Sequence, residues 1–281
     1  MQALVEVARR KGSALVVGLD PVPDRLPSGL LEGREEHEAV FEFCRDVLEA
    51  VAPYAAAVKI QLACFERLGP EGMRVYGELV REASGMGLPV IADAKRGDIA
   101  ETAAAYAEAH LRRYGAHCIT VNPYMGADAV LPFLEEARRL GHGGGVFVLV
   151  ATSNPSAGAF QEASEPPASE LAARLVAELG EERGGGYPDA GAVVGVTRPE
   201  AGRRVRGLLP RALFLAPGFG AQGGGVAGVR ALLDGSGGGV LVASSRAILY
   251  AFEGSGGDYR DAAAEAARTA RNRLRAAGVR V

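Results

Sequence analysis

Asp93, Lys95 and Asp98 form the part of the sequence with the clearest potential for chemistry. They lie in DAKRGDI (93–99), between the apolar run PVIA and a segment with helical spacing. Side chains alternate in a strand, so Asp93 and Lys95 are predicted to project on the same side. Such a pair can hold charge beside a reacting carbon or form an ordinary salt bridge, and the spacing alone leaves both open. Asp98, at the predicted start of a helix, can also cap backbone amides.

The scarcity of lysine draws attention to two side chains. Of the 31 basic residues only Lys11, Lys59 and Lys95 are lysines, and the rest are arginines. A guanidinium cannot give up its proton near neutral pH and is larger than an ammonium. We therefore expect Lys59 and Lys95 to stand where a compact, titratable cation is needed, and Lys11, in a charged N-terminal segment, to be solvated.

These residues fall on a regular alternation of strands and helices. Short apolar runs recur at 14–19, 56–60, 89–93, 117–121, 146–151, 192–196, 212–216 and 239–243. The segments between them have helical spacing, which predicts parallel strands joined by helical crossovers. Eight strands predict a closed (β/α)8 TIM barrel, a single domain over 1–281, with a closing helix within 257–277.

In an α/β barrel the chemistry gathers where the strands end. The polar residues at the predicted strand ends are Asp20, Lys59, Asp93 with Lys95, Asn122, Thr152 with Ser153, Thr197, Pro217 to Gly223, and Ser244 to Arg246. We therefore expect these groups to converge on one rim of the barrel.

Composition argues against several classes of partner. The formal net charge is -3, the aromatic share is 6% and there is no Trp, so neither nucleic acid nor an anionic membrane is an expected partner. No segment has the 18 apolar residues of a membrane span, and the N-terminus is charged, so we expect a cytoplasmic protein. The three cysteines are expected to be buried thiols, and the four histidines lack the spacing of a metal site.

A glycine-rich segment follows the seventh predicted strand. Gly218, Gly220 and Gly223 satisfy the G-x-G-x-x-G pattern of dinucleotide sites. That interpretation needs an acidic residue at the end of the next strand, whereas this strand ends in Ser244, Ser245 and Arg246. The pattern fits better the phosphate site that α/β barrels often carry after strands seven and eight.

Seven blocks in order resemble the orotidine 5'-phosphate decarboxylase family, in particular its longer bacterial second type. They are VGLDP (17–21), VKIQLACFE (58–66), DAKRGDIAET (93–102), VNPYMG (121–126), ATSNP (151–155), APGFGAQGG (216–224) and VASSRAILYA (242–251). The resemblance covers nearly the whole chain. It implies decarboxylation of a pyrimidine nucleotide without a cofactor or metal, in the pathway that makes pyrimidines.

The resemblance also implies roles for individual residues. Lys59, Asp93, Lys95 and Asp98 would alternate in sign around the ribose and the reacting carbon, with Lys95 as proton donor. Asp98, Ile99 and Thr102 would reach the substrate from the neighbouring subunit of a homodimer. The remaining substrate-binding residues would be Asp20 and Lys59 at the ribose, Ser153 at the pyrimidine, and Pro217, Gln222, Gly223 and Arg246 at the phosphate end.

Two other functions remain open at this stage. One is a related barrel enzyme that decarboxylates or cleaves sugar phosphates, shares the Asp-x-Lys-x-x-Asp strand end and usually needs magnesium. The other is a barrel that binds phosphate without catalysis. The loop after Pro155, SAGAFQEASEPP, is expected to cover the pyrimidine, although its length and composition depart from the pattern of the family.

Overall fold

Eight parallel strands form a closed barrel in which each strand pairs with the next, and β8 pairs with β1. The computed structural model describes residues 1–182, 186–220, 224–255 and 257–280. The strands are β1 (Leu15–Leu19), β2 (Ala57–Gln61), β3 (Val90–Arg96), β4 (Cys118–Val121), β5 (Gly145–Ala151), β6 (Ala190–Val194), β7 (Phe214–Ala216) and β8 (Val240–Ser244). The predicted (β/α)8 barrel is confirmed.

One predicted strand is displaced along the chain. The run at 192–196 predicts the sixth strand, whereas β6 begins at Ala190 and ends at Val194. Ala190 pairs with Val146 and Gly191 with Phe147 of β5. A side chain at Gly191 would collide with the Phe147 ring, since a Cβ there would lie 2.9 Å from two of its atoms. The strand therefore starts with small residues that carry little hydrophobic signal.

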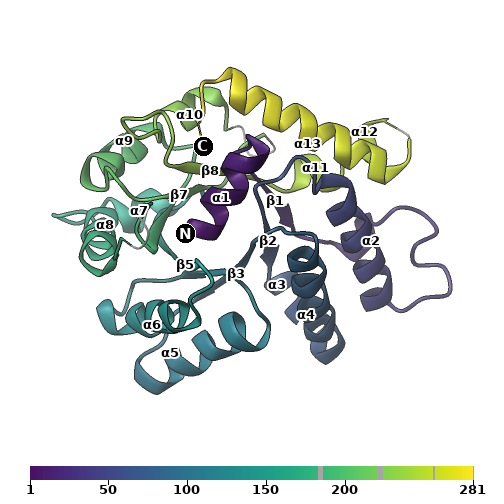
Figure 1. The fold of residues 1–281 in the computed structure, drawn as a ribbon, viewed down its shortest axis with the longest axis horizontal. Coiled ribbons are helices and arrows are strands. Elements are labelled where there is room, and N and C mark those ends of the chain that lie inside the picture. The colour runs from purple at the N-terminus through teal and green to yellow at the C-terminus, as the bar shows by residue number, and fades with distance from the viewer. Residues whose placement is uncertain (183–185, 221–223, 256, 281) are drawn as a thin grey trace.

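Helices surround the barrel (Figure 1). They are α1 (Gln2–Lys11), η1 (Pro23–Arg25), α2 (Glu36–Val51), α3 (Ala63–Glu66), α4 (Gly69–Gly85), α5 (Ala100–Ala107), η2 (Glu108–Arg113), η3 (Ala127–Ala129), α6 (Leu131–Leu140), α7 (Ala157–Gln161), α8 (Ala168–Leu179), α9 (Pro199–Leu208), α10 (Val226–Arg230), α11 (Arg246–Leu249), α12 (Phe252–Ser255) and α13 (Tyr259–Ala276). The final helix, α13, begins after the capping residue Asp258 and packs on α2, as expected of a closing helix.

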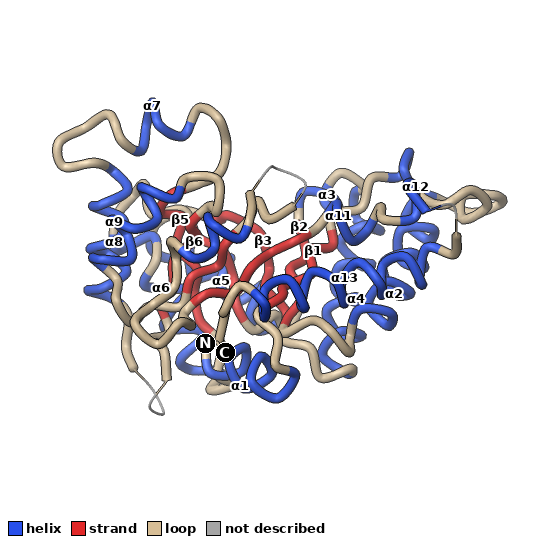
Figure 2. The backbone as a smooth tube through the Cα atoms, turned by 90° about the horizontal axis from the view of Figure 1, so that it is seen from above, coloured by secondary structure: helices blue, strands red, loops and turns tan. Residues whose placement is uncertain are grey.

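The alternation of side chains along each strand divides the core in two. Outward residues such as Val58 and Ile60 of β2 pack under the helices in one cluster. Inward residues such as Ala57 and Phe147 form a second cluster with Leu4 and Val5 of α1. Helix α1 therefore fills the end of the barrel where the strands begin, and Figure 2 shows α7 on the opposite side from α1.

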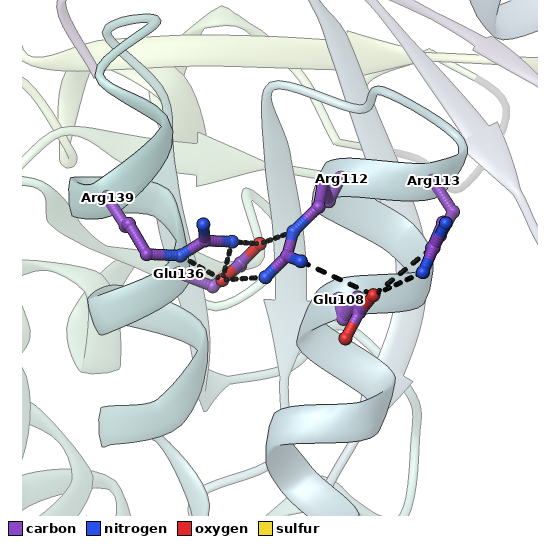
Figure 3. Close-up of polar contacts among 5 residues, drawn as sticks. All are labelled: Glu108, Arg112, Arg113, Glu136 and Arg139. Carbon is purple, nitrogen blue, oxygen red and sulfur yellow. Dashed lines mark hydrogen bonds and ion pairs between the residues drawn. The ribbon is translucent and has the colours of Figure 1, made fainter.

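The outer helices are joined by charged side chains as well as by apolar contacts. Glu136 of α6 accepts hydrogen bonds from Arg112 of η2 and from Arg139, and Glu108 pairs with Arg112 and Arg113 (Figure 3). The Arg112 and Arg139 guanidiniums lower the pKa of Glu136 to about 2. This cluster lies on the outside of the barrel and fixes η2 against α6.

Two minor expectations need correction. Lys11 is not simply solvated, because its Nζ donates to the backbone oxygen of Ala52 at 2.6 Å. Cys44 and Cys118 are buried as expected, but Cys64 is half-buried. Among the described residues, no helix is both long and apolar enough to cross a membrane.

Candidate active site

A pocket of about 510 Å³ opens where the strands end, and seven of the predicted site residues line it. They come from six segments of the barrel, and they are Asp20, Lys59, Asp93, Lys95, Ser153, Pro217 and Arg246. Its floor is apolar and includes Leu149, Val193, Leu215 and Ala243. The expected convergence of these polar groups on one rim is confirmed.

Asp93 lies at the centre of the charged residues in this pocket. Its Oδ1 accepts hydrogen bonds from Lys95 Nζ at 2.5 Å and Thr120 Oγ1 at 3.0 Å. Its Oδ2 accepts from Lys59 Nζ at 2.7 Å and Gln61 Nε2 at 3.1 Å. An ionised carboxylate has about four lone-pair positions, so these four donors occupy its accepting capacity and fix its orientation.

Two opposing effects set the ionisation of the buried pair. Burial by itself lowers the pKa of Lys59, but the Asp93 and Asp20 carboxylates outweigh it and raise that pKa above its ordinary value. Burial raises the pKa of Asp93, but the Lys59 and Lys95 ammoniums reverse this and hold it well below its ordinary value. The pair is therefore ionised at neutral pH.

Lys95 differs from its neighbours in both exposure and backbone. Its side chain is 46% exposed and points into the pocket, whereas those of Lys59 and Asp93 are nearly covered. Its φ is 48°, in the left-handed region that non-glycine residues rarely adopt. The strand is irregular here, because the register between β3 and β4 shifts between Ala92 and Arg96.

The opposite side of the pocket is built from β1, β7 and β8. Arg246 follows β8 and is exposed, and no partner for its guanidinium is found among the described residues. Gly18 of β1 permits Ser245 to come close, since a Cβ at Gly18 would lie 1.9 Å from Ser245 Oγ. An unpaired guanidinium at an open rim can form charge-assisted hydrogen bonds with a phosphate.

The end of β5 is held to the loop that follows it. Gln161 of α7 accepts a hydrogen bond from the Thr152 backbone N–H at 3.0 Å and donates to Thr152 Oγ1 at 2.7 Å. Ser153 comes next and lines the pocket, as does Gln161. The loop expected over the pyrimidine thus contains α7 and is anchored beside Ser153.

Three of the described residues predicted for the site do not line this pocket. Asp98, Ile99 and Thr102 lie at or near the start of α5, and they are half-buried or exposed. Helix α5 begins after Ile99 and has no side-chain cap. Among the described residues, the Asp98 carboxylate accepts the neighbouring Ile99 N–H, at 2.8 Å, so it does not cap the helix as expected. Gln222 and Gly223 lie outside the described residues.

Three residues in the site were missed by sequence reasoning. Gln61 and Thr120 bind Asp93, and Gln161 holds the β5 loop. Gln61 lies two residues after Lys59 and therefore on the same face of β2, and Thr120 is the polar residue of an apolar strand. These signals were available in the sequence, whereas no spacing rule connects Gln161 with Thr152.

The comparisons with known proteins agree with this geometry. The sequence model described as "Orotidine 5'-phosphate decarboxylase / HUMPS family" matches residues 13–255. The chain belongs to this family. It is 42% identical over 259 residues to the orotidine 5'-phosphate decarboxylase of Rhodopirellula baltica, covering 86% of this chain and 85% of that one. The corresponding enzyme of Deinococcus radiodurans is 42% identical over 254 residues, or 89% of each chain.

Solved structures extend the family match to three dimensions. The OMP decarboxylase of Leishmania donovani superimposes with a TM-score of 0.80 at 34% sequence identity, covering 98% of this chain and 97% of that one. The resemblance to the orotidine 5'-phosphate decarboxylase family is thus confirmed. The chain is an enzyme with the (β/α)8 barrel of that family. No group of three or more His, Cys, Asp or Glu side chains suited to a metal ion occurs in the described parts of the chain.

Proposed function

We propose that the chain converts orotidine 5'-phosphate to uridine 5'-phosphate and CO2. The observation that carries the proposal is the arrangement of Asp93 at the mouth of the barrel. Its Oδ2 accepts from the Lys59 ammonium and its Oδ1 from the Lys95 ammonium. Arg246 lines the same pocket and can bind the phosphate of a nucleotide. The curated relatives are named for this reaction, and they match the chain over most of its length.

The proposed chemistry uses charges already present in the pocket. The bond between C6 and the carboxylate carbon breaks, CO2 leaves, and the electron pair stays on C6. Lys95 Nζ then gives a proton to C6 and regains one from solvent. A preorganised ammonium stabilises the developing carbanion more strongly in a pocket closed to water than in bulk solvent. An arginine in place of Lys95 could supply the charge but not readily the proton.

Asp93 is proposed to act at the start of the same step. A substrate carboxylate that approaches Lys95 Nζ also approaches Asp93, because the two side chains lie 2.5 Å apart. Like charges repel, and the departure of neutral CO2 removes that repulsion. Asp20 and Lys59, which lie 3.4 Å apart, are proposed to hold the ribose hydroxyls, and Ser153 the pyrimidine.

We further propose a homodimer in which Asp98, Ile99 and Thr102 complete the pocket of the partner. Ile99 is 53% exposed, Tyr124 77% and Met125 44%, so three large apolar side chains lie open to solvent here. All three follow β3 or β4 on the rim that carries the pocket. A second copy of the chain would bury this surface and bring Asp98 into an active site, and a closed pair uses the same surface twice.

Three further expectations accompany this proposal. The seven sequence blocks support placing the chain in the longer bacterial second type of the family. A single catalytic domain over 1–281 and a cytoplasmic location remain predictions from the sequence.

The magnesium-dependent alternative is less consistent with the site. A divalent ion needs free carboxylate oxygens, but the Asp93 oxygens already accept from Lys59, Gln61, Lys95 and Thr120. An ion bound there would have to displace an ammonium. The arrangement therefore favours the nucleotide decarboxylase.

The direct test follows the ultraviolet absorbance of orotidine 5'-phosphate with the purified protein, with and without a chelator. We expect loss of substrate at the same rate in both samples, with release of CO2. A rate that collapses with chelator and returns with magnesium would favour the sugar-phosphate enzyme. Nucleotide binding without release of CO2 would instead indicate the non-catalytic barrel, and either result overturns the proposal.

A further inference from the structure

Thr120 of β4 connects the two central residues of the site through a single hydroxyl group. It is 1% exposed, and its Oγ1 accepts a hydrogen bond from the backbone N–H of Lys95 at 2.9 Å. The same oxygen donates its hydrogen to Oδ1 of Asp93 at 3.0 Å. Because an ionised carboxylate can only accept, the direction of the second bond is settled.

The backbone that Thr120 holds is the irregular part of β3. Ala92 pairs with Ile119 and Arg96 pairs with Val121, so residues 93–95 lie opposite Thr120 alone. Within this bulge Lys95 has a φ of 48°. A left-handed conformation at a residue with a Cβ costs free energy and persists only where the surrounding structure enforces it. The bond from Lys95 N–H to Thr120 supplies such a constraint.

We infer that Thr120 is a positioning residue, which holds the strained Lys95 backbone and the Asp93 carboxylate in the geometry that presents Lys95 Nζ to the substrate. This inference rests on the proposed decarboxylation. Thr120 lies at the pocket wall but is only 1% exposed, so we infer that it acts on the reacting carbon through Asp93 and Lys95. Its removal should therefore alter the chemical step more than the binding of the nucleotide.

The pocket separates these two effects in space. Arg246 and Ser153, proposed to bind the phosphate and the pyrimidine, follow β8 and β5, whereas Thr120 contacts the bulge of β3. A valine at position 120 would keep the shape of the side chain but could form neither hydrogen bond. Lys95 could then relax towards an ordinary backbone, and a displacement of about 1 Å of a catalytic group can cost about a hundredfold in rate.

Ser13 provides a matched control. It is also 1% exposed, its Oγ donates to the Tyr54 oxygen at 2.6 Å, and it accepts from the Leu15 N–H at 3.2 Å. It precedes β1 and therefore lies at the end of the barrel opposite the pocket. Ser13→Ala thus removes one donated and one accepted hydrogen bond at an equally buried hydroxyl, without touching the site.

The experiment compares Thr120→Val, Thr120→Ser and Ser13→Ala with the parent protein. The readouts are kcat and KM for orotidine 5'-phosphate, the Kd of the product uridine 5'-phosphate, and Tm. For Thr120→Val we expect kcat to fall by about 30-fold, or about 2 kcal/mol in activation free energy. KM and the product Kd should stay within about threefold. Thr120→Ser should recover kcat to within about threefold of the parent, and Ser13→Ala should lower Tm with kcat unchanged.

Several outcomes would overturn the inference. They are an unchanged kcat in Thr120→Val, a serine variant as slow as the valine variant, or a loss confined to KM. If Thr120→Val does not fold, Thr120→Ala takes its place with the same expected split between kcat and KM. A parent protein that releases no CO2 defeats the proposed function itself, a result distinct from an active parent whose Thr120 variants match it.

Discussion

Nζ of Lys95 lies 2.5 Å from Oδ1 of Asp93, although Lys95 is half-exposed and Asp93 is nearly covered. The second oxygen of Asp93 is held by the buried Lys59. One carboxylate therefore separates two ammoniums with different surroundings, and only Lys95 presents a large exposed side-chain surface. This difference supports the assignment of proton transfer to Lys95, with Lys59 at the ribose.

Replacing Lys95 by alanine is expected to abolish turnover and preserve nucleotide binding. A general acid typically contributes two to four orders of magnitude, and loss of the carbanion's counter-charge adds to this, so kcat should fall at least about a thousandfold. The Kd for uridine 5'-phosphate, measured by calorimetry, should stay within about threefold because Arg246 remains. Lys11→Ala is the control, since Lys11 does not line the described part of the pocket and its Nζ donates to the backbone oxygen of Ala52. A Lys95→Ala protein with kcat within tenfold of the parent would exclude Lys95 as the acid.

Arg246→Ala should impair the nucleotide reaction and leave the nucleoside reaction unchanged. Hydrogen bonds to a charged group contribute about 1.5–3 kcal/mol, so kcat/KM for orotidine 5'-phosphate should fall about 10- to 100-fold. Orotidine, which lacks the phosphate, should react slowly and at the same rate in both proteins, because binding energy at the phosphate assists the chemical step. Equal turnover of nucleotide and nucleoside by the parent would contradict this role of the phosphate.

Mixing two inactive variants should restore activity if Asp98 acts across a dimer interface. Lys95→Ala and Asp98→Ala each damage every site of their own homodimer. A mixed dimer contains one intact site, and half of the dimers are mixed after random exchange, so activity should reach about a quarter of the parent value. The check is an assay after mixing and exchange, with sedimentation to establish the dimer. Mixtures that stay as inactive as the separate variants would place Asp98 in its own subunit's site, and an Asp98→Ala variant as active as the parent would place it outside catalysis.

Glu136→Gln should lower stability in a manner that depends on pH. The Arg112 and Arg139 guanidiniums lower the pKa of Glu136 from 4.5 to about 2, so its stabilisation is present above 4.5 and is lost as the pH falls through about 2. The arginines are partly exposed, which limits the loss at pH 7 to about 1 kcal/mol. Urea unfolding of parent and variant at pH 7 and at lower pH should show the difference narrowing on acidification. A difference that is constant with pH would remove the ionic explanation.

Much of the fold was predictable because parallel barrel strands are nearly continuous apolar runs. All eight were predicted, and the bounds failed chiefly at β6. There Gly191 is needed because a Cβ would collide with the Phe147 ring. That requirement comes from the neighbouring strand and leaves no hydrophobic signal of its own. The alternation of side chains along a strand was likewise enough to predict that Asp93 and Lys95 share a face, and the scarcity of lysine singled out Lys59 and Lys95.

By itself the sequence determined the barrel, the rim that carries the chemistry, and most of the charged residues there, because strand periodicity and residue type are local properties. Only the tertiary structure decided that Thr120 and Gln61 complete the bonds of Asp93, that Lys95 has a left-handed backbone, and that Gln161 holds Thr152. These features depend on how far one strand is shifted against its neighbour and on where a loop returns to the rim. Distances between segments remote in the chain arise from closure of the barrel, and no spacing within one segment encodes them.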